Sequence, residues 1–166
     1  IFFVSFCLLV LINGSNFIDG INCNVSIYFL IVLLSIIIFF DNFVVNRELL
    51  INFIFILLII IILNALGILY LGDSGSYTLS LFVGFFLINF SQINNTVSPY
   101  LFVVLLWYPC FELLFSMIRR SLKKIKTYEP DTSHLHHLIY KKLKIYYKIK
   151  NNLILHLLTV FIINFY

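Results

Sequence analysis

Long apolar runs, broken by three short polar islands, constrain this chain more than any other feature of its sequence. The islands are residues 13–20, 71–76 and 130–137. The chain as a whole has a mean hydropathy of +1.07, with 62% hydrophobic and only 11% charged residues. This composition provides too little polar surface to cover a soluble globular protein, so we expect a membrane protein whose apolar surface contacts lipid.

The apolar runs predict an all-α fold, a polytopic membrane bundle of about six spanning helices. A spanning helix needs about 20 apolar residues, and the runs lack the strict alternation of barrel strands. The expected spans are residues 1–12, 21–40, 49–63, 77–90, 100–118 and 153–166. We expect the first and last spans to be truncated and the fourth to be short for a full crossing. Residues 1–166 are expected to form a single integral membrane domain.

The basic residues predict which ends of these helices face the cytoplasm. Of the 11 Lys and Arg residues, all except Arg47 lie between Arg119 and Lys150. Basic loops stay on the cytoplasmic side of a membrane, so residues 119–152 are expected to form a cytoplasmic basic loop. Counting spans backwards from this loop places all three polar islands on the same cytoplasmic face.

The second island offers a carboxylate at the start of an apolar run. Asp73 lies between Gly72 and Ser74, where glycine allows close backbone approach and the N–H groups of a helix start can hold oxyanions. Because Mg²⁺ prefers one or two carboxylates together with phosphate oxygens, Asp73 is a candidate metal ligand at a nucleotide site. The alternative is that Asp73 only caps the N-terminus of the following helix.

The first island holds an amide and a carboxylate, Asn16 and Asp19, three residues apart. Both side chains could face one pocket, where Asn reads a base or ribose edge and Asp accepts from a donor or helps to bind a metal. The alternative is an Asx-turn that ends a spanning helix, with Asp-Gly as ordinary turn chemistry.

The third island contains three histidines, His134, His136 and His137. If this segment is helical, His134 and His137 share a face while His136 points elsewhere. Imidazolium groups beside Lys141 and Lys142 would form a positive pocket, suited to phosphate binding or to general acid–base chemistry. The alternative is a loose basic loop that touches anionic lipid.

Glu112 lies within the fifth apolar run, at a depth where an ionised carboxylate is costly. Such residues usually face the interior of a bundle and have a partner or a function. Arg119 and Arg120 lie about two turns away, too far for a direct pair along the same helix. We therefore favour a structural role for Glu112 over a catalytic one.

Taken in order, the islands resemble the signatures of the polyprenyl-phosphate N-acetylhexosamine-1-phosphate transferases, the family that includes phospho-N-acetylmuramoyl-pentapeptide transferase. Residues 13–20 resemble its N-x-x-N-x-x-D-G loop, residues 70–76 its F-M-G-D-x-G-S loop, and residues 130–137 its P-D-x-x-H-x-H-H loop. The resemblance covers nearly the whole chain. It implies transfer of a sugar phosphate from a UDP-sugar, with UDP-N-acetylhexosamine favoured, to polyprenyl phosphate with release of UMP, as in the initiation of cell-envelope polysaccharide synthesis.

The resemblance also implies roles for individual residues. The implied catalytic residues are Asp19, Asp73, His136 and His137. The implied substrate-binding residues are Asn16, Asp19, Tyr70 and His134. Asp73 would bind Mg²⁺ and the diphosphate, Asn16 and Asp19 would lie in the uridine pocket, and Tyr70 would stack on uracil.

The implied partners are the UDP-sugar, the polyprenyl phosphate lipid and the membrane; a homodimer is left open, and nucleic acid is not expected. The implied location is the bacterial inner membrane, with the active-site loops in the cytoplasm.

The chain also departs from the family pattern. Family members carry an adjacent Asp pair in an early cytoplasmic loop, and this sequence contains no Asp-Asp. Asn22 stands where many members have a second acidic residue, Glu112 where we expect Asp, and Tyr70 where Phe is common. Truncation explains the missing pair most simply, so we expect this chain to be the C-terminal portion of a larger transferase and to be inactive by itself.

Two other readings stay open. A fragment of a multi-pass transporter or channel would place its polar residues near mid-membrane, often at broken helices. The islands lie at one interface, which favours the enzyme, although Glu112 fits either class. A partial gene product without activity is the third reading.

Overall fold

The computed structural model describes residues 2–40, 47–94, 97–123, 133–149 and 151–165. Within these ranges the fold is all-α, with eight helices and no strand. In chain order the helices are α1 Phe2–Ile18, α2 Asn24–Phe40, α3 Arg47–Ala65, α4 Gly72–Ile93, α5 Tyr100–Leu105, α6 Trp107–Lys123, α7 Leu135–Tyr147 and α8 Asn152–Phe165. The predicted all-α class is confirmed.

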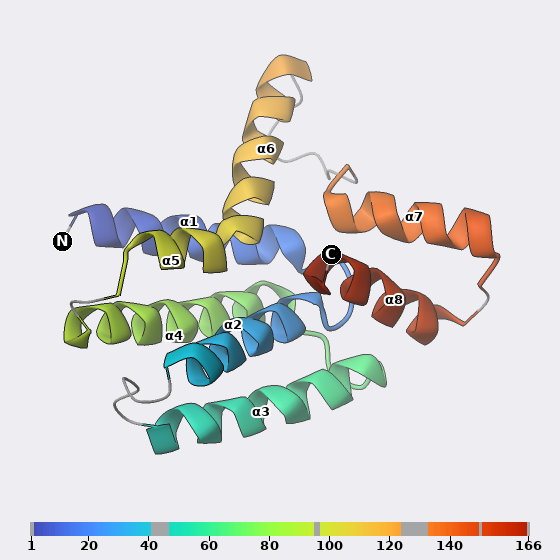
Figure 1. Ribbon diagram of the computed structural model, residues 1–166. Coiled ribbons are helices and arrows are strands. Elements are labelled where there is room, and N and C mark those ends of the chain that lie inside the picture. The colour runs from blue at the N-terminus through green and yellow to red at the C-terminus, as the bar shows by residue number, and fades with distance from the viewer. Residues whose placement is uncertain (1, 41–46, 95–96, 124–132, 150, 166) are drawn as a thin grey trace.

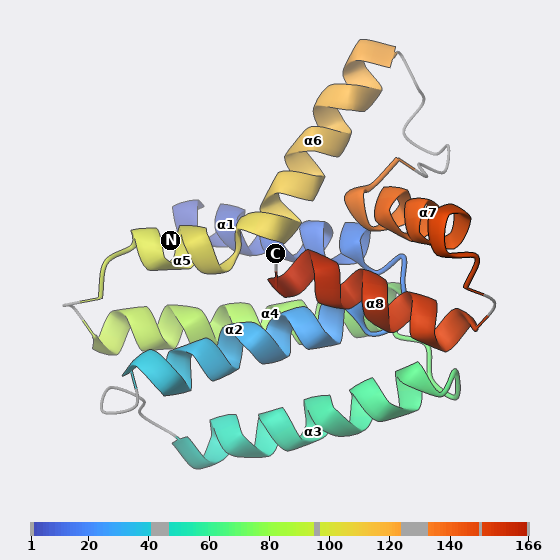
Figure 2. The same ribbon diagram turned by 45° about the vertical axis from the view of Figure 1, so that its right-hand side comes forward.

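Helices α1 to α4 run side by side, and α6 points steeply away from them (Figure 1). Helix α2 contacts α1, α3, α4 and α8, while α1 packs mainly against α4 and α6. Because α2 has neighbours on several sides, its apolar residues form the centre of the core. The most deeply buried of them are Val25, Phe29, Val32, Leu33 and Ile36. Helices α7 and α8 pack on each other at one end of the bundle (Figure 2).

Two of the described helices, Arg47–Ala65 and Gly72–Ile93, are long and apolar enough to cross a membrane. Helix α4 has 22 residues, so the fourth run is longer than the expected 77–90. Three shorter apolar helices, α1, α2 and α8, have 14 to 17 residues in the described part of the chain. Large apolar side chains on α3, such as Phe55 and Ile59, are more than half exposed. A bilayer would cover such a surface; the bundle of six spans stays a prediction.

The fifth apolar run, expected to form one span over residues 100–118, is broken between α5 and α6. Pro109 has no N–H, so the carbonyl of Leu105, four residues earlier, lacks its helical donor. The hydroxyl of Tyr28 on α2 donates to this carbonyl instead, at 2.5 Å. The prediction of one continuous helix is therefore wrong, because proline and a side chain from another helix stabilise the break.

The first polar island also differs from expectation, since residues 13–16 are helical and not a turn. The side chains of Asn13 and Ser15 each donate to a carbonyl four residues earlier, at 2.7 Å, and are thus satisfied inside α1. Gly14 lies against the backbone of Pro109, where a methyl group would collide with the carbonyl oxygen. This close approach of α1 and α6 holds the last turn of α1 rigidly at the polar end of the bundle.

Candidate functional site

The first and second islands meet where α1 ends beside the start of α4. Asn16 Nδ2 donates to the hydroxyl of Tyr77 at 3.2 Å, and the hydroxyl of Ser76 donates to Asn16 Oδ1 at 3.3 Å. Asn16 thus uses both ends of its amide to join the two helices. The hydroxyl of Ser76 also lies 3.1 Å from the carbonyl oxygen of Asp73, so the junction includes the first turn of α4.

Asp19 and Asp73 are close enough to repel each other. Burial, and then the negative charge of Asp73, raise the pKa of Asp19 from 3.8 to about 7. Asp73 is exposed in the first turn of α4, where the N-cap position belongs to Leu71 and no side chain caps the helix. The alternative reading of Asp73 as the helix cap is therefore wrong.

Two neighbouring carboxylates agree with part of the donor set that Mg²⁺ uses. In the described ranges no group of three or more His, Cys, Asp or Glu side chains is placed to hold a metal. Mg²⁺, however, usually takes one or two carboxylates and completes its shell with water and substrate phosphates. A cation near Asp19 and Asp73 would relieve the repulsion that raises the pKa of Asp19. These two residues thus fit the ion implied by the motifs.

The third island meets the first at Gly20, which faces two histidine rings. A methyl group at Gly20 would collide with Nε2 of His136 and would lie 2.8 Å from Nε2 of His137. The rings of His134 and His136 are stacked, with centroids 5.6 Å apart, and those of His136 and His137 are 4.2 Å apart. The described residues of all three polar islands therefore converge at one end of the bundle, while Pro130, Asp131 and Thr132 of the third island lie outside the described residues.

The expectation that His136 points away from the other two histidines is wrong. His134 has an extended backbone, with φ −68° and ψ 150°, because it is the N-cap of α7 and not a helical residue. Its side chain therefore does not follow helical spacing, and its ring lies over that of His136. The three rings form one cluster, which we call the histidine cluster: His134, His136 and His137.

His136 is fully buried, and neither of its ring nitrogens has a hydrogen-bond partner among the described residues. Burial, and then the neighbouring His137 and His134, lower the pKa of His136 from 6.5 to about 3. The ring is therefore neutral at pH 7 and adds no charge to a positive pocket. A neutral imidazole offers one donor and one acceptor, and leaving either unpaired costs about 1–3 kcal/mol.

Two cations beside the histidine cluster come from α6. Nη1 of Arg119 donates to the carbonyl of Ser133, directly before His134, at 3.1 Å. The guanidinium of Arg120 lies 6.0 Å from the ring centroid of Phe17, which is 5.3 Å from that of His134. We did not predict a role for either arginine, because the sequence pattern indicated only that they are cytoplasmic.

Lys141 and Lys142, expected beside the histidines, are exposed on α7. Lys142 lines a separate groove that includes none of the three histidines. The structure therefore differs from the predicted positive pocket, because Lys142 lines another groove and His136 is neutral.

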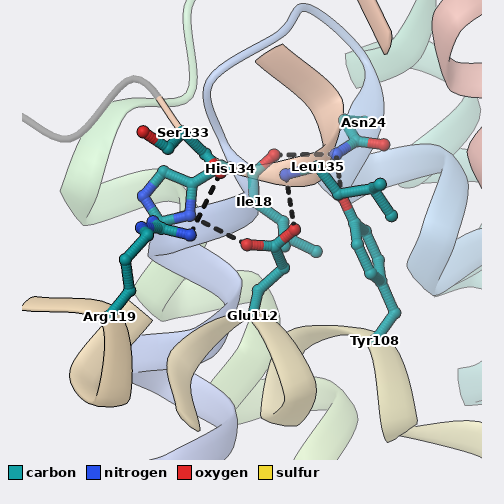
Figure 3. Close-up of polar contacts among 8 residues, drawn as sticks. All are labelled: Ile18, Asn24, Tyr108, Glu112, Arg119, Ser133, His134 and Leu135. Carbon is teal, nitrogen blue, oxygen red and sulfur yellow. Dashed lines mark hydrogen bonds and ion pairs between the residues drawn. The ribbon is translucent and has the colours of Figure 1, made fainter. Parts of the chain in front are cut away.

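Glu112 joins α6 to the start of α7 (Figure 3). Its carboxylate accepts hydrogen bonds from Nδ1 of His134 at 2.9 Å and from the backbone N–H of Leu135 at 2.7 Å. Glu112 is 1% exposed and His134 is 4% exposed, so water does not compete for these bonds. This arrangement agrees with the structural role expected for Glu112.

A second buried contact holds the turn between α1 and α2 against α6. Nδ2 of Asn24 donates to the carbonyl of Ile18 at 2.8 Å and lies 3.4 Å from the hydroxyl of Tyr108, as Figure 3 also shows. Asn24 and Tyr108 are both buried. Because Ile18 directly precedes Asp19, this contact positions the carboxylate at the polar end of the bundle.

Tyr70 lines a pocket that includes neither Asn16 nor Asp19. The pocket has a volume of about 420 Å³ and lies between the end of α3 and the start of α8. Its polar lining includes Asn22 and His156, and the backbone N–H of Asn22 donates to Nδ1 of His156 at 3.3 Å. His156 was not predicted as a site residue, since it lies far along the chain in an apolar run.

Comparisons with protein-family models, with curated proteins and with solved structures found no match for this chain. The functional interpretation therefore rests on the motifs and on their arrangement in space. The structure brings residues of all three motifs together. It also places Glu112, Arg119 and Arg120 beside the histidine cluster, and His156 in the pocket that Tyr70 lines.

Proposed function

We propose that the intact transferase, of which we expect this chain to be the C-terminal portion, transfers a sugar phosphate from a UDP-sugar to polyprenyl phosphate, with release of UMP, at the cytoplasmic face of the bacterial inner membrane. The proposal is supported most strongly by the convergence of three motif segments that lie far apart in the sequence. Asn16 bonds the second segment, Gly20 contacts the third, and Asp19 lies near Asp73.

The reaction needs little covalent chemistry from the protein. A phosphate oxygen of the lipid attacks the β-phosphorus of the UDP-sugar. The bond from this phosphorus to the oxygen that bridges to the α-phosphate then breaks, and this oxygen leaves as part of UMP. The product is a polyprenyl diphosphate sugar, and no water, oxidant or reductant is consumed. Catalysis of such a transfer depends mainly on positioning and on stabilising negative charge.

Asp19 and Asp73 would hold the Mg²⁺ ion that the motifs imply. When bound, this ion supplies positive charge next to the diphosphate. Asp73 is exposed and so can reach a soluble nucleotide, whereas Asp19 is partly buried behind it. The pKa of Asp19, raised to about 7 by burial and by Asp73, indicates that a cation would be bound with release of a proton.

The histidine cluster would contact the phosphates. His136 is neutral, because burial and two neighbouring histidines lower its pKa to about 3. It is fully buried, so the partly exposed His137 would make this contact and His136 would support its ring. Arg119 and Arg120 on α6 lie next to the cluster and carry the positive charge that a dianionic lipid phosphate needs. Glu112 would hold His134 in one orientation during this contact.

We place the nucleoside in the 420 Å³ pocket beside Tyr70. The ring of Tyr70 is 72% exposed and is therefore accessible for stacking on a base. Asn16, in contrast, already uses both ends of its amide in bonds to Tyr77 and Ser76. We infer that Asn16 positions the first turn of α4 and does not read the uridine.

The test is release of UMP by the purified intact transferase, including the segment that carries the Asp-Asp pair, given a UDP-sugar, polyprenyl phosphate and Mg²⁺. Asp73→Asn is expected to lower the rate about 100-fold or more, because loss of one preorganised electrostatic group typically has this cost. Ser74→Ala, which changes the adjacent exposed residue, serves as the control and is expected to keep near-normal activity. Undiminished turnover by Asp73→Asn would remove Asp73 from the mechanism. Failure of the unmodified protein to release UMP from any UDP-sugar would overturn the proposed function.

A further inference from the structure

A groove between α7 and α8 lies outside the candidate site. It has a volume of about 490 Å³ and none of the proposed catalytic residues lines it. Its lining residues are Ile139, Lys142, Leu143, Tyr146, Tyr147 and Ile162. The groove thus combines an apolar floor with one cation and two phenol hydroxyls.

The charged residues of α7 and α8 are all basic. Lys141, Lys142, Lys144 and Lys148 are all exposed on α7 or at its C-cap. The sequence contains no Asp or Glu after Asp131, so no acidic side chain of α7 or α8 offsets these charges. An unbalanced positive surface beside an apolar groove is complementary to a molecule with an anionic head and a hydrocarbon chain.

The exposed side chains of α7 are typical of a helix that lies at a membrane interface. Ile145, Tyr146 and Tyr147 are all more than 70% exposed, and these three consecutive residues lie between Lys144 and Lys148. Tyrosines gather where bilayer meets water, and helices that lie in this plane combine basic and apolar residues. Helix α8, which forms the other wall of the groove, is largely apolar.

We propose that the groove between α7 and α8 binds an anionic phospholipid of the membrane. The lipid phosphate lies on Lys142, within reach of the hydroxyls of Tyr146 and Tyr147. An acyl chain lies against Ile139 and Ile162. This site does not depend on the transferase reaction, and its occupant anchors the hairpin of α7 and α8, and with it the histidine cluster at the start of α7, to the membrane surface.

Native mass spectrometry of the full-length protein in detergent tests this proposal without an activity assay. Phosphatidylglycerol and phosphatidylcholine with the same acyl chains are titrated separately. We expect phosphatidylglycerol to bind more tightly, and Lys142→Gln to weaken its binding about fivefold, as expected for one lysine near anionic lipid. Lys141→Gln is the matched control, because this exposed lysine of the same helix does not line the groove, and it is expected to have a smaller effect.

Three results would overturn the proposal. The first is equal binding of the two lipids by the unmodified protein. The second is an equal loss of phosphatidylglycerol binding in the two lysine variants, which would indicate a diffuse charge effect and no groove. The third is displacement of bound phosphatidylglycerol by inorganic phosphate or by equimolar polyprenyl phosphate, which would identify a phosphate site or an acceptor-lipid site instead. Both lysines are exposed, so neither variant is expected to disturb folding.

Discussion

Two neighbouring regions of the candidate site differ in how their polar groups are satisfied. In the first, which we call the Glu112 anchor, the buried carboxylate of Glu112 accepts hydrogen bonds from Nδ1 of His134 and from the backbone N–H of Leu135. In the second, which we call the open region because its polar groups lack partners, His136 has no hydrogen-bond partner among the described residues. Burial, and then the charge of Asp73, disfavour the ionised form of Asp19 in the same region. Buried polar groups without partners cost free energy. The anchor therefore stabilises the fold, whereas the open region would gain stability from a ligand.

The largest expected effect comes from breaking the anchor. Glu112→Ala removes the carboxylate that accepts from Nδ1 of His134 and from the N–H of Leu135, and we expect a loss of about 2–4 kcal/mol in the free energy of unfolding. Denaturant titration of the protein in detergent measures this loss. Glu48→Ala, at an exposed carboxylate in the first turn of α3, is the control and should change stability by about 0.5 kcal/mol or less. Equal losses in the two variants would show that the anchor is not stabilising.

A smaller effect, on activity and not on stability, is expected in the open region. Gly20→Ala places a methyl group against Nε2 of His136 and must displace the histidine cluster. We expect UMP release to fall about 10- to 100-fold, the usual cost of displacing a catalytic group by about 1 Å. Gly75→Ala is the control, since the three atoms nearest its methyl group would all belong to the side chain of Leu71, at 3.2 to 3.3 Å, and none to a histidine. Full activity of Gly20→Ala would separate the histidines from the reaction.

The smallest expected effect concerns the pH dependence of stability. Burial and Asp73 raise the pKa of Asp19 from 3.8 to about 7 in the folded protein. This group thus contributes stability below about pH 4 that is lost as the pH rises through 7. Compared with Asp19→Asn, the unmodified protein should lose about 1 kcal/mol between pH 4 and pH 8, after allowance for partial exposure.

Unfolding of both proteins in a metal chelator, at several pH values, checks this difference. His136, whose pKa is lowered to about 3 by burial, acts in the opposite direction and loses stability as the pH falls below 6.5. It is present in both proteins, so its contribution cancels in the comparison. Parallel pH profiles for the two proteins would mean that Asp19 titrates normally.

Local patterns in the sequence were enough to identify the motifs, but they predicted poorly how the motif residues lie relative to one another. The acidic and histidine residues were recognisable from short segments such as residues 71–76. The extended backbone of His134, in contrast, is stabilised by Glu112, which lies 22 residues earlier. The contact of Asn22 with His156 spans 134 residues. No periodicity or spacing rule reports such pairs, because they form only when distant helices pack.

The helical class of this protein was determined by its sequence alone, because so apolar a chain must satisfy its backbone hydrogen bonds within its own helices. Pro109, readable in the sequence, also marks the place where the fifth run breaks. The tertiary structure decided where Asn16, Gly20 and His136 lie relative to one another. Each contact joins helices whose positions depend on the packing of the whole bundle around α2, and packing of that kind is a property of all the side chains together.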